Sequence, residues 1–363
     1  MKLSYALIAA IVVVAFLISV PLLNTTKEDF STYNTAWNGA SDAKALASSD
    51  GYTTRSVFAL SEIGSGDGVL FMLNPNSSVS FSASDASTLQ SFVKNGGVLV
   101  LANDFGNGNA VLSGLGVSGE ARFNGSLLED NVSKGVDAAH PLITDVNASG
   151  ITAGVHELYF NYGTALDVSG TNVTVLARSA PTSYLLAPGG GNATVNATTG
   201  AHPVLATLDY GNGRIVLLSD PSVFSNDMLG QADNQQLLTS MFANLTGGNT
   251  AVPIMFDESH FASPPVFSLL YDRINADDTV KYTVIVLVSA AFVIGINATA
   301  LVRRRLRQGQ GKDMGPAPGD MPTNEAAVIA DIVRAHPGWR RARVKGFLKQ
   351  LQQRRGIRRD NRK

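Results

Sequence analysis

Residues 82–102 read SASDASTLQSFVKNGGVLVLA, and this stretch decides the fold class that the sequence predicts. Its first part, 82–94, spaces apolar residues as an amphipathic helix does and ends at Asn-Gly-Gly, a typical helix stop. Its second part, 98–102, is a continuous apolar run with the length of a buried strand. Helix, short turn and buried strand together are typical of a parallel sheet covered by helices.

Similar apolar runs lie on both sides of this stretch, at 55–60, 68–73, 204–208, 214–218 and 252–256. Residues from about 119 to 203 are instead rich in Thr, Val, Asn and Gly with short alternating patterns, which predict a β-rich insertion. We therefore predict an α/β fold with a doubly wound, mostly parallel sheet, a β-rich insertion and a flanking transmembrane helix on each side.

Two apolar stretches have the length of a membrane span. Residues 3–23 and 282–302 each run 21 residues without a charge, and about 20 apolar residues cross a bilayer as a helix. The first has no clean small-residue cleavage site, which favours a transmembrane helix or signal anchor over a cleaved signal peptide. Arginines directly after the second are typical of a cytoplasmic flank.

The charge of the chain changes sign at the second stretch. Residues 24–280 carry 9 basic and 24 acidic side chains, net −15, whereas residues 303–363 carry 17 basic and 5 acidic side chains, net +12. By the positive-inside rule we predict a multi-pass protein of the cell membrane, with residues 24–280 extracytoplasmic and both termini cytoplasmic. Asn-x-Ser/Thr sequons fit an external domain and predict glycosylation at Asn24, Asn76, Asn124, Asn131, Asn147, Asn172, Asn192, Asn196 and Asn244.

The basic tail has two parts. Residues 303–322 are rich in Gly and Pro and predict a flexible linker. Residues 323–363 contain two helical patterns separated by His336-Pro337-Gly338, and the second pattern is basic and amphipathic. Such a helix favours an anionic lipid surface or an acidic protein as its partner, and no nucleic acid is expected.

Two segments carry a resemblance to a known family. They are residues 92–112, which include GGVLVLANDFGNGN, and residues 210–226, YGNGRIVLLSDPSVFSN. Together they resemble domain-of-unknown-function family 4350, an archaeal type of membrane-anchored branch of the class I glutamine amidotransferase-like superfamily. The resemblance covers about residues 33–260 and implies an amidotransferase-like or flavodoxin-like sheet. It also implies a place among other membrane or envelope proteins, in an envelope-associated complex.

The resemblance places two altered motifs in this chain. Active members of that superfamily carry a Gly-x-Cys-x-Gly elbow and a later His-Pro-Glu, which supply a Cys-His-Glu triad. At the matching positions this chain has Asp104 and Asp220-Pro221-Ser222, and it contains no cysteine at all. Glutaminase chemistry needs a thiolate beside an imidazole. The resemblance therefore implies a pseudoenzyme, and no cofactor is predicted.

Polar residues remain where the predicted strands end, which is where open α/β sheets bind ligands. Amides and carboxylates there suit a hydroxyl-rich ligand, such as a glycan, or a peptide. Their alternative role is to cap helices and turns. The candidate ligand-binding residues are Asn74, Asn103, Asp104, Asn107, Asn109 and Asp220. We expect the side chains of Asp104 and Asp220 within about 10 Å of each other across one cleft, without a histidine beside them.

A second cluster follows the last predicted strand. Asp257, Glu258 and His260 are candidate metal ligands or an acid–base pair, and their alternative role is structural. Together these patterns favour a non-enzymatic extracytoplasmic binding or sensing module. The alternatives are a metal-dependent extracytoplasmic hydrolase and an accessory subunit of an export system.

Overall fold

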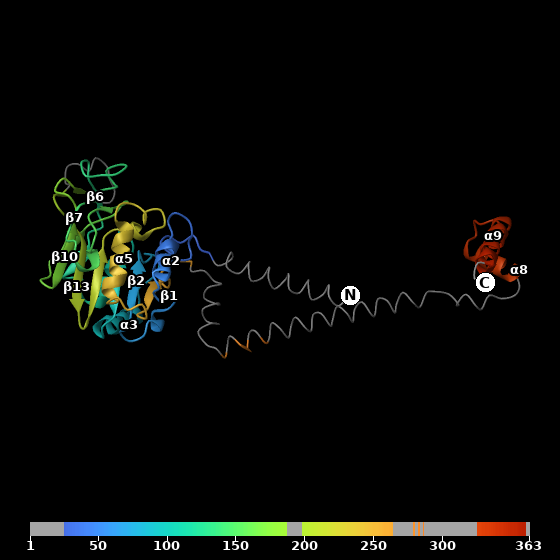
Figure 1. Cartoon of the computed structure of the whole chain (residues 1–363), viewed down its shortest axis with the longest axis horizontal. Helices are drawn as coiled ribbons and strands as arrows, with labels where there is room; N and C mark the ends of the chain where they lie inside the picture. The colour runs from blue at the N-terminus through green and yellow to red at the C-terminus, as the bar shows by residue number, and fades with distance from the viewer. Residues whose placement is uncertain are drawn as a thin grey trace. The chain divides into compact units, whose positions relative to one another are not determined.

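The structure is a computed structural model that describes residues 25–186, 198–263 and 325–360, together with 279, 282–283 and 286. The chain divides into two compact units, Met1–Asp277 and Asp278–Lys363. We call residues 25–263 the domain and residues 325–360 the tail hairpin, and each is described by itself (Figure 1).

An eight-stranded mixed sheet forms the centre of the domain, with the order β1-β15-β2-β3-β14-β13-β10-β7. The first five strands run parallel to one another. The last three continue the sheet in antiparallel fashion from β14. In the order of the sheet, the strands are β1 (Thr54–Val57), β15 (Ile254–Asp257), β2 (Val69–Leu73), β3 (Val98–Ala102), β14 (Gly213–Leu218), β13 (Pro203–Tyr210), β10 (Val173–Arg178) and β7 (Asp145–Val146).

Helices cover both faces of the parallel strands (Figure 1). Helices α2 (Ser41–Ser49) and α5 (Asn234–Leu245) share one apolar core with Phe71 of β2. Helices α3 (Ala83–Lys94) and α4 (Gly108–Leu115) share the other core with its neighbour Met72. Alternation of side chains along a strand places these two residues on opposite faces.

The stretch around α3 folds for local reasons. Ser82 and Asp85 form a reciprocal capping box that starts the helix. After the helix, Gly96 has a φ of +116°, which side-chain-bearing residues rarely adopt. A Cβ on Gly97 would lie 2.5 Å from the Phe92 ring, so that the turn into β3 depends on this glycine.

Shorter elements fill the rest of the domain. Three small sheets are formed by β12 (Thr198–Thr199), β11 (Tyr184–Leu186) and β5 (Leu127–Glu129), by β4 (Ala121–Phe123) and β9 (Leu166–Val168), and by β6 (Leu142–Ile143) and β8 (Leu158–Tyr159). The short 3₁₀ helices are η1 (Leu60–Glu62), η2 (Gly150–Thr152) and η4 (Pro221–Phe224).

The predicted fold class was wrong. Five of the predicted strands are nevertheless present and parallel to one another, namely β1, β2, β3, β14 and β15. The observed sheet is mixed, and the body around it is rich in short strands with few helices, unlike a doubly wound α/β fold flanked by two spans. The reason is the two-residue turn at 211–212, which joins β13 to β14. Only antiparallel neighbours can be joined by so short a connection.

The predicted multi-pass localisation is also corrected. In the described ranges of the chain, no helix combines the length and apolar character needed to cross a membrane. This finding contradicts a two-span protein with residues 24–280 extracytoplasmic and both termini cytoplasmic. The stretches 3–23 and 282–302 on which that prediction rested lie outside the described residues, apart from 282–283 and 286, and so does the linker at 303–322.

The tail hairpin consists of α8 (Glu325–Ala335) and α9 (Arg341–Asp360). The helices are interrupted at 336–340, as the His-Pro-Gly sequence predicts. The rings of His336 and Trp339 stack in this connection, with their centroids 4.8 Å apart.

Candidate functional site

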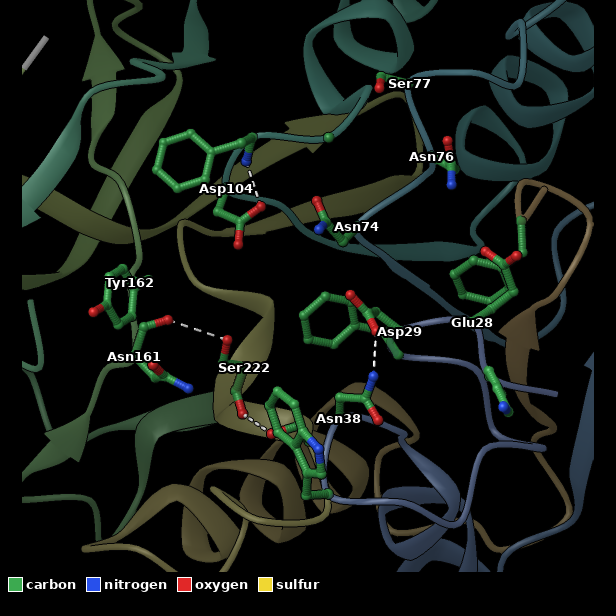
Figure 2. Close-up of a pocket in the computed structure, with 17 residues that line it drawn as sticks. Glu28, Asp29, Asn38, Asn74, Asn76, Ser77, Asp104, Asn161, Tyr162 and Ser222 are labelled. Carbon is green, nitrogen blue, oxygen red and sulfur yellow. Dashed lines mark hydrogen bonds between the residues drawn. The ribbon is translucent and has the colours of Figure 1, made fainter. Parts of the chain in front are cut away.

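A cleft of about 740 Å³ lies at the carboxyl ends of β2 and β3 (Figure 2). Six parts of the chain build it: the irregular N-terminal segment, the loops after β2 and β3, the loop at 161–162, η4 with the residue that follows it, and the segment after β15. Its lining residues are Lys27, Glu28, Asp29, Phe30, Trp37, Asn38, Asn74, Asn76, Ser77, Asp104, Phe105, Gly106, Asn161, Tyr162, Ser222, Ser225 and Phe261.

Asp104 lies on the cleft wall beside Asn74 (Figure 2). It comes two residues after the end of β3, and its carboxylate accepts a hydrogen bond from the backbone N–H of Phe105. Burial raises the pKa of Asp104, and the nearby charge of Asp29 raises it further. Backbone hydrogen bonds and the side chain of Asn74 oppose this rise without cancelling it. Asp104 therefore holds a proton more readily than an ordinary aspartate.

Asp220 is completely buried at the end of β14 and lies behind the cleft wall rather than on it. Its Oδ2 accepts a hydrogen bond of 2.6 Å from the backbone N–H of Asn161, and its Oδ1 accepts one of 2.8 Å from that of Ser222. Burial raises the pKa of Asp220 to about 7, and the negative charge of Asp104 contributes to the rise. The two carboxylates therefore influence each other, while Asp220 anchors two segments that line the cleft.

Asn74 is the candidate amide that faces the cleft. Its φ of +45° is in the left-handed region, which asparagine tolerates better than most residues. Its Oδ1 is buried and has no hydrogen-bond partner in the described structure. A Cβ on Gly106 would lie 2.3 Å from that oxygen, so the loops after β2 and β3 are closely packed.

The other three candidate amides support the backbone instead. The Oδ1 of Asn103 accepts a hydrogen bond of 2.9 Å from the backbone N–H of Gly108 at the start of α4. Asn107 Nδ2 donates to the carbonyl of Val79 at 3.1 Å. Asn109 exchanges two hydrogen bonds, of 2.8 and 2.9 Å, with the backbone of Phe123. All three side chains therefore support the backbone, as the alternative reading of the sequence allowed, and their role in ligand binding stays a prediction.

The second cluster, at Asp257, Glu258 and His260, is brought together only in part. Among the described residues, no group of three or more His, Cys, Asp or Glu side chains could hold a metal ion. His260 Nδ1 lies 2.7 Å from Asp257 Oδ2, whereas the carboxylate of Glu258 binds Ser31 and Thr32. Successive residues leave a strand towards opposite faces, and this separates the two acids.

His260 lies in a different environment from the cleft carboxylates. It borders a separate cavity of about 290 Å³, and its Nε2 lies 4.0 Å from Asp85 Oδ2. Burial lowers the pKa of His260, but the hydrogen bond and charge of Asp257 and the charge of Asp85 outweigh burial and raise it overall. This histidine links the end of β15 to the start of α3.

Glycosylation stays a prediction. Asn131, Asn147, Asn172 and Asn244 are exposed, and Asn76 and Asn124 are half-buried. Asn24, Asn192 and Asn196 lie outside the described residues.

The sequence did not reveal the aromatic residues of the cleft. Trp37, Phe105 and Tyr162 line it, and their exposed fractions are 68%, 50% and 52%. They come from three irregular segments without a periodic pattern, so only the folded structure brings them together. Asp29 and Asn38, whose side chains are hydrogen-bonded to each other, were missed for the same reason.

Two solved structures show a distant likeness to the chain. The "mmIFT52 N-terminal domain" is 17% identical with a TM-score of 0.38, over 49% of this chain and 76% of that one. The β-galactosidase from Bacillus circulans sp. alkalophilus is 15% identical with a TM-score of 0.27, over 50% of this chain and 22% of that one. Likenesses at this level carry no argument about function.

The family comparison is more direct. No curated protein sequence matches the chain. Residues 32–242 match the family described as Domain of unknown function (DUF4350), which confirms the family expected from residues 92–112 and 210–226. This match spans more than half of the sequence, from before β1 to within α5. The chain therefore belongs to the DUF4350 family.

Proposed function

We propose that the cleft is a non-catalytic binding site for a hydroxyl-rich ligand, and that a neutral saccharide is the ligand class. The observation that carries this proposal is the set of three exposed aromatic rings, Trp37, Phe105 and Tyr162, around a polar cleft. Large aromatic side chains are rarely left in solvent on several separate segments around one cavity unless a ligand covers them.

Both parts of the lining suit a sugar. The C–H face of a pyranose ring is apolar and can pack flat on an aromatic ring, while its hydroxyl groups point outwards from the ring edge. Amide and carboxylate groups can then accept and donate hydrogen bonds to those hydroxyls in fixed directions. Asn38, Asn74, Asn161 and Asp104 offer such groups in the same cleft (Figure 2).

The charge of the lining favours a neutral ligand over an anionic one. Glu28, Asp29 and Asp104 contribute three carboxyl groups, whereas Lys27 is the single basic residue among the lining residues. A phosphate or carboxylate ligand would be repelled at close range in such a cleft.

The resemblance to the class I amidotransferase-like superfamily supports a binding role without catalysis. By that resemblance, Asp104 would correspond to the elbow cysteine and Asp220 to the histidine. Asp220 is buried, and both of its oxygens accept backbone hydrogen bonds, so it supports the cleft rather than a reaction. We propose that the superfamily's site is retained here as a binding cleft.

The test is a calorimetric titration of the purified full chain with a panel of neutral and acidic oligosaccharides. We expect neutral saccharides to bind, and Trp37→Ala to weaken binding about 5-fold or more, since loss of an aromatic contact costs roughly 1 kcal/mol or more. Trp339→Ala is the matched control, because Trp339 is also an exposed tryptophan, at 55%, but belongs to the tail hairpin. That variant should bind as the wild type does.

Two results would overturn the proposal. One is the absence of saccharide binding at millimolar concentration, or binding that Trp37→Ala leaves unchanged. The other is release of new reducing ends from a bound oligosaccharide that is abolished by Asp104→Asn, since this would show catalysis at the cleft. If binding alone occurs, Asp104→Asn should weaken it while leaving the unfolding midpoint nearly unchanged, because an asparagine of the same size can still accept the hydrogen bond from the backbone N–H of Phe105.

A further inference from the structure

The tail hairpin leaves large apolar side chains exposed, because its two helices form only a small core. Among the side chains described at 326–350, one large apolar side chain is nearly fully buried, that of Val344, which is 3% exposed. Trp339 and Phe347 are 55% and 59% exposed. The described hairpin spans 325–360, and units below about 40 residues usually need a metal, disulfides or an associated surface to be stable. The chain has no cysteine, so disulfides cannot supply this support.

A groove of about 1030 Å³ runs between the two helices of the hairpin. Val344, Phe347 and Leu348 form a stripe along α9 at helical spacing, and Ile332 of α8 and Trp339 of the connection complete the apolar lining. Arg340 and Arg343 also line the groove. Apolar and cationic side chains thus line the same groove.

We propose that this groove binds an amphipathic helix of a partner protein, whose apolar row fills the groove and whose flanking acidic residues face Arg340 and Arg343. Docking of an amphipathic helix into an apolar groove is a common mode of recognition. A third helix placed against two packed helices would cover Trp339 and Phe347 and form a small helical bundle.

Charge and shape favour this occupant over two others. A second copy of the hairpin would bring Arg340 and Arg343 close to the same residues of the other copy, and such like charges repel. A bilayer surface covers exposed apolar side chains but is flat on this scale, so it would leave a groove between two helices unfilled. An acidic amphipathic helix matches both the concave shape and the positive charge.

The test measures binding of a fluorescent peptide to the purified full chain by anisotropy. The probe is a designed amphipathic helix of about five turns, roughly 18 residues, with leucines on one face and glutamates beside them. A peptide with the same leucines and lysines in place of the glutamates is the charge control. We expect micromolar binding of the glutamate peptide, weakened by added salt, and at least about 10-fold weaker binding of the lysine peptide.

Matched variants locate the site. Phe347→Ala should weaken binding about 10-fold or more, as truncation of a central aromatic anchor does. Arg343→Glu and Lys349→Glu change the net charge equally, but Arg343 lines the groove and Lys349 does not. The first should weaken binding about 10-fold and the second less than about 3-fold. Far-ultraviolet circular dichroism of each variant checks that the helices are retained.

Four outcomes would overturn the proposal, and the first three concern the peptides and the charge variants. They are equal binding of the glutamate and lysine peptides, equal effects of Arg343→Glu and Lys349→Glu, and failure of the glutamate peptide to bind while anionic phosphatidylglycerol vesicles do. A concentration-dependent dimer that Phe347→Ala dissociates would assign the groove to a second copy and would also overturn it.

Discussion

Replacement of Glu258 by glutamine should remove part of the pH dependence of stability. Glu258 is fully buried, and its carboxylate accepts hydrogen bonds from Ser31 Oγ at 2.7 Å, the Thr32 backbone N–H at 2.7 Å and Thr32 Oγ1 at 2.6 Å. Burial raises its pKa from 4.5 to about 7, against the effect of these hydrogen bonds. A glutamine of the same shape can still accept from Thr32 and can donate to Ser31 Oγ.

The sign and size of the effect follow from the raised pKa. Because the folded state holds the proton more tightly than the unfolded state, Glu258 favours folding below pH 4.5, and this contribution is lost as the pH rises to about 7. The difference between the two pKa values corresponds to about 3 kcal/mol. We therefore expect the wild type to lose about 3 kcal/mol more stability than Glu258→Gln between pH 4.5 and pH 7.5.

Equilibrium urea unfolding at a series of pH values measures this difference. Fluorescence of Trp37 reports on the domain if Trp339→Phe is the common background, since these are the two tryptophans of the chain. Asp67→Asn is the matched control, because Asp67 is exposed, and its pH profile should follow that of the background. Parallel profiles of Glu258→Gln and the background would refute the reasoning, because they would show that Glu258 binds protons equally in both states.

Two further changes test the core and the support of the short strands. Phe71→Ala should lower the free energy of unfolding, measured in urea, by about 3–5 kcal/mol, because Phe71 is 1% exposed and its ring packs against three other phenylalanine rings. Phe105→Ala, at an exposed site, is the control and should cost less than about 1 kcal/mol. Equal losses of stability in the two variants would contradict this prediction. Asp130→Ala should cost roughly 3 kcal/mol at pH 7, because this buried carboxylate accepts hydrogen bonds from two backbone N–H groups and two hydroxyls. Burial raises the pKa of Asp130, but those hydrogen bonds outweigh burial and lower it overall. The contribution of Asp130 to stability is therefore present above about pH 3.8 and is lost as the pH falls through the lower pKa of the folded state. If Asp130→Ala were as stable as the wild type at pH 7, this role would be refuted.

The sequence predicted the parallel strands because each one is a continuous apolar run between turn residues. It also placed Asp104 and Asp220 near the carboxyl ends of strands, since each comes two residues after such a run. The antiparallel half of the sheet was missed, although the short turn at 211–212 between two apolar runs already indicated a hairpin. The pairing of β10 with β13 depends on contacts between residues far apart in the chain, which no local pattern reveals.

The candidate site residues also fall into two groups, those whose placement the sequence could predict and those whose placement it could not. Asp257 and Glu258 could have been separated from the sequence, because neighbours at the end of a strand point to opposite faces. The role of Asn109 could not have been predicted from the sequence, because its hydrogen-bond partner is the backbone of Phe123, a residue of β4. Trp37 and Tyr162 reach the cleft only through the packing of irregular segments, so a search along strand ends does not find them.

The position of β15 sets the order in which the domain can be completed during synthesis. This strand is the last of the domain in sequence, yet it lies between β1 and β2 in the sheet. Until the ribosome has released residues 254–257, β1 has no neighbour, and β2 exposes one unpaired edge with apolar side chains on both faces. Unpaired strand edges invite association with other chains. A nascent chain that ends before β15 should therefore be prone to such association, and the addition of this single strand pairs β1 and closes the open edge of β2.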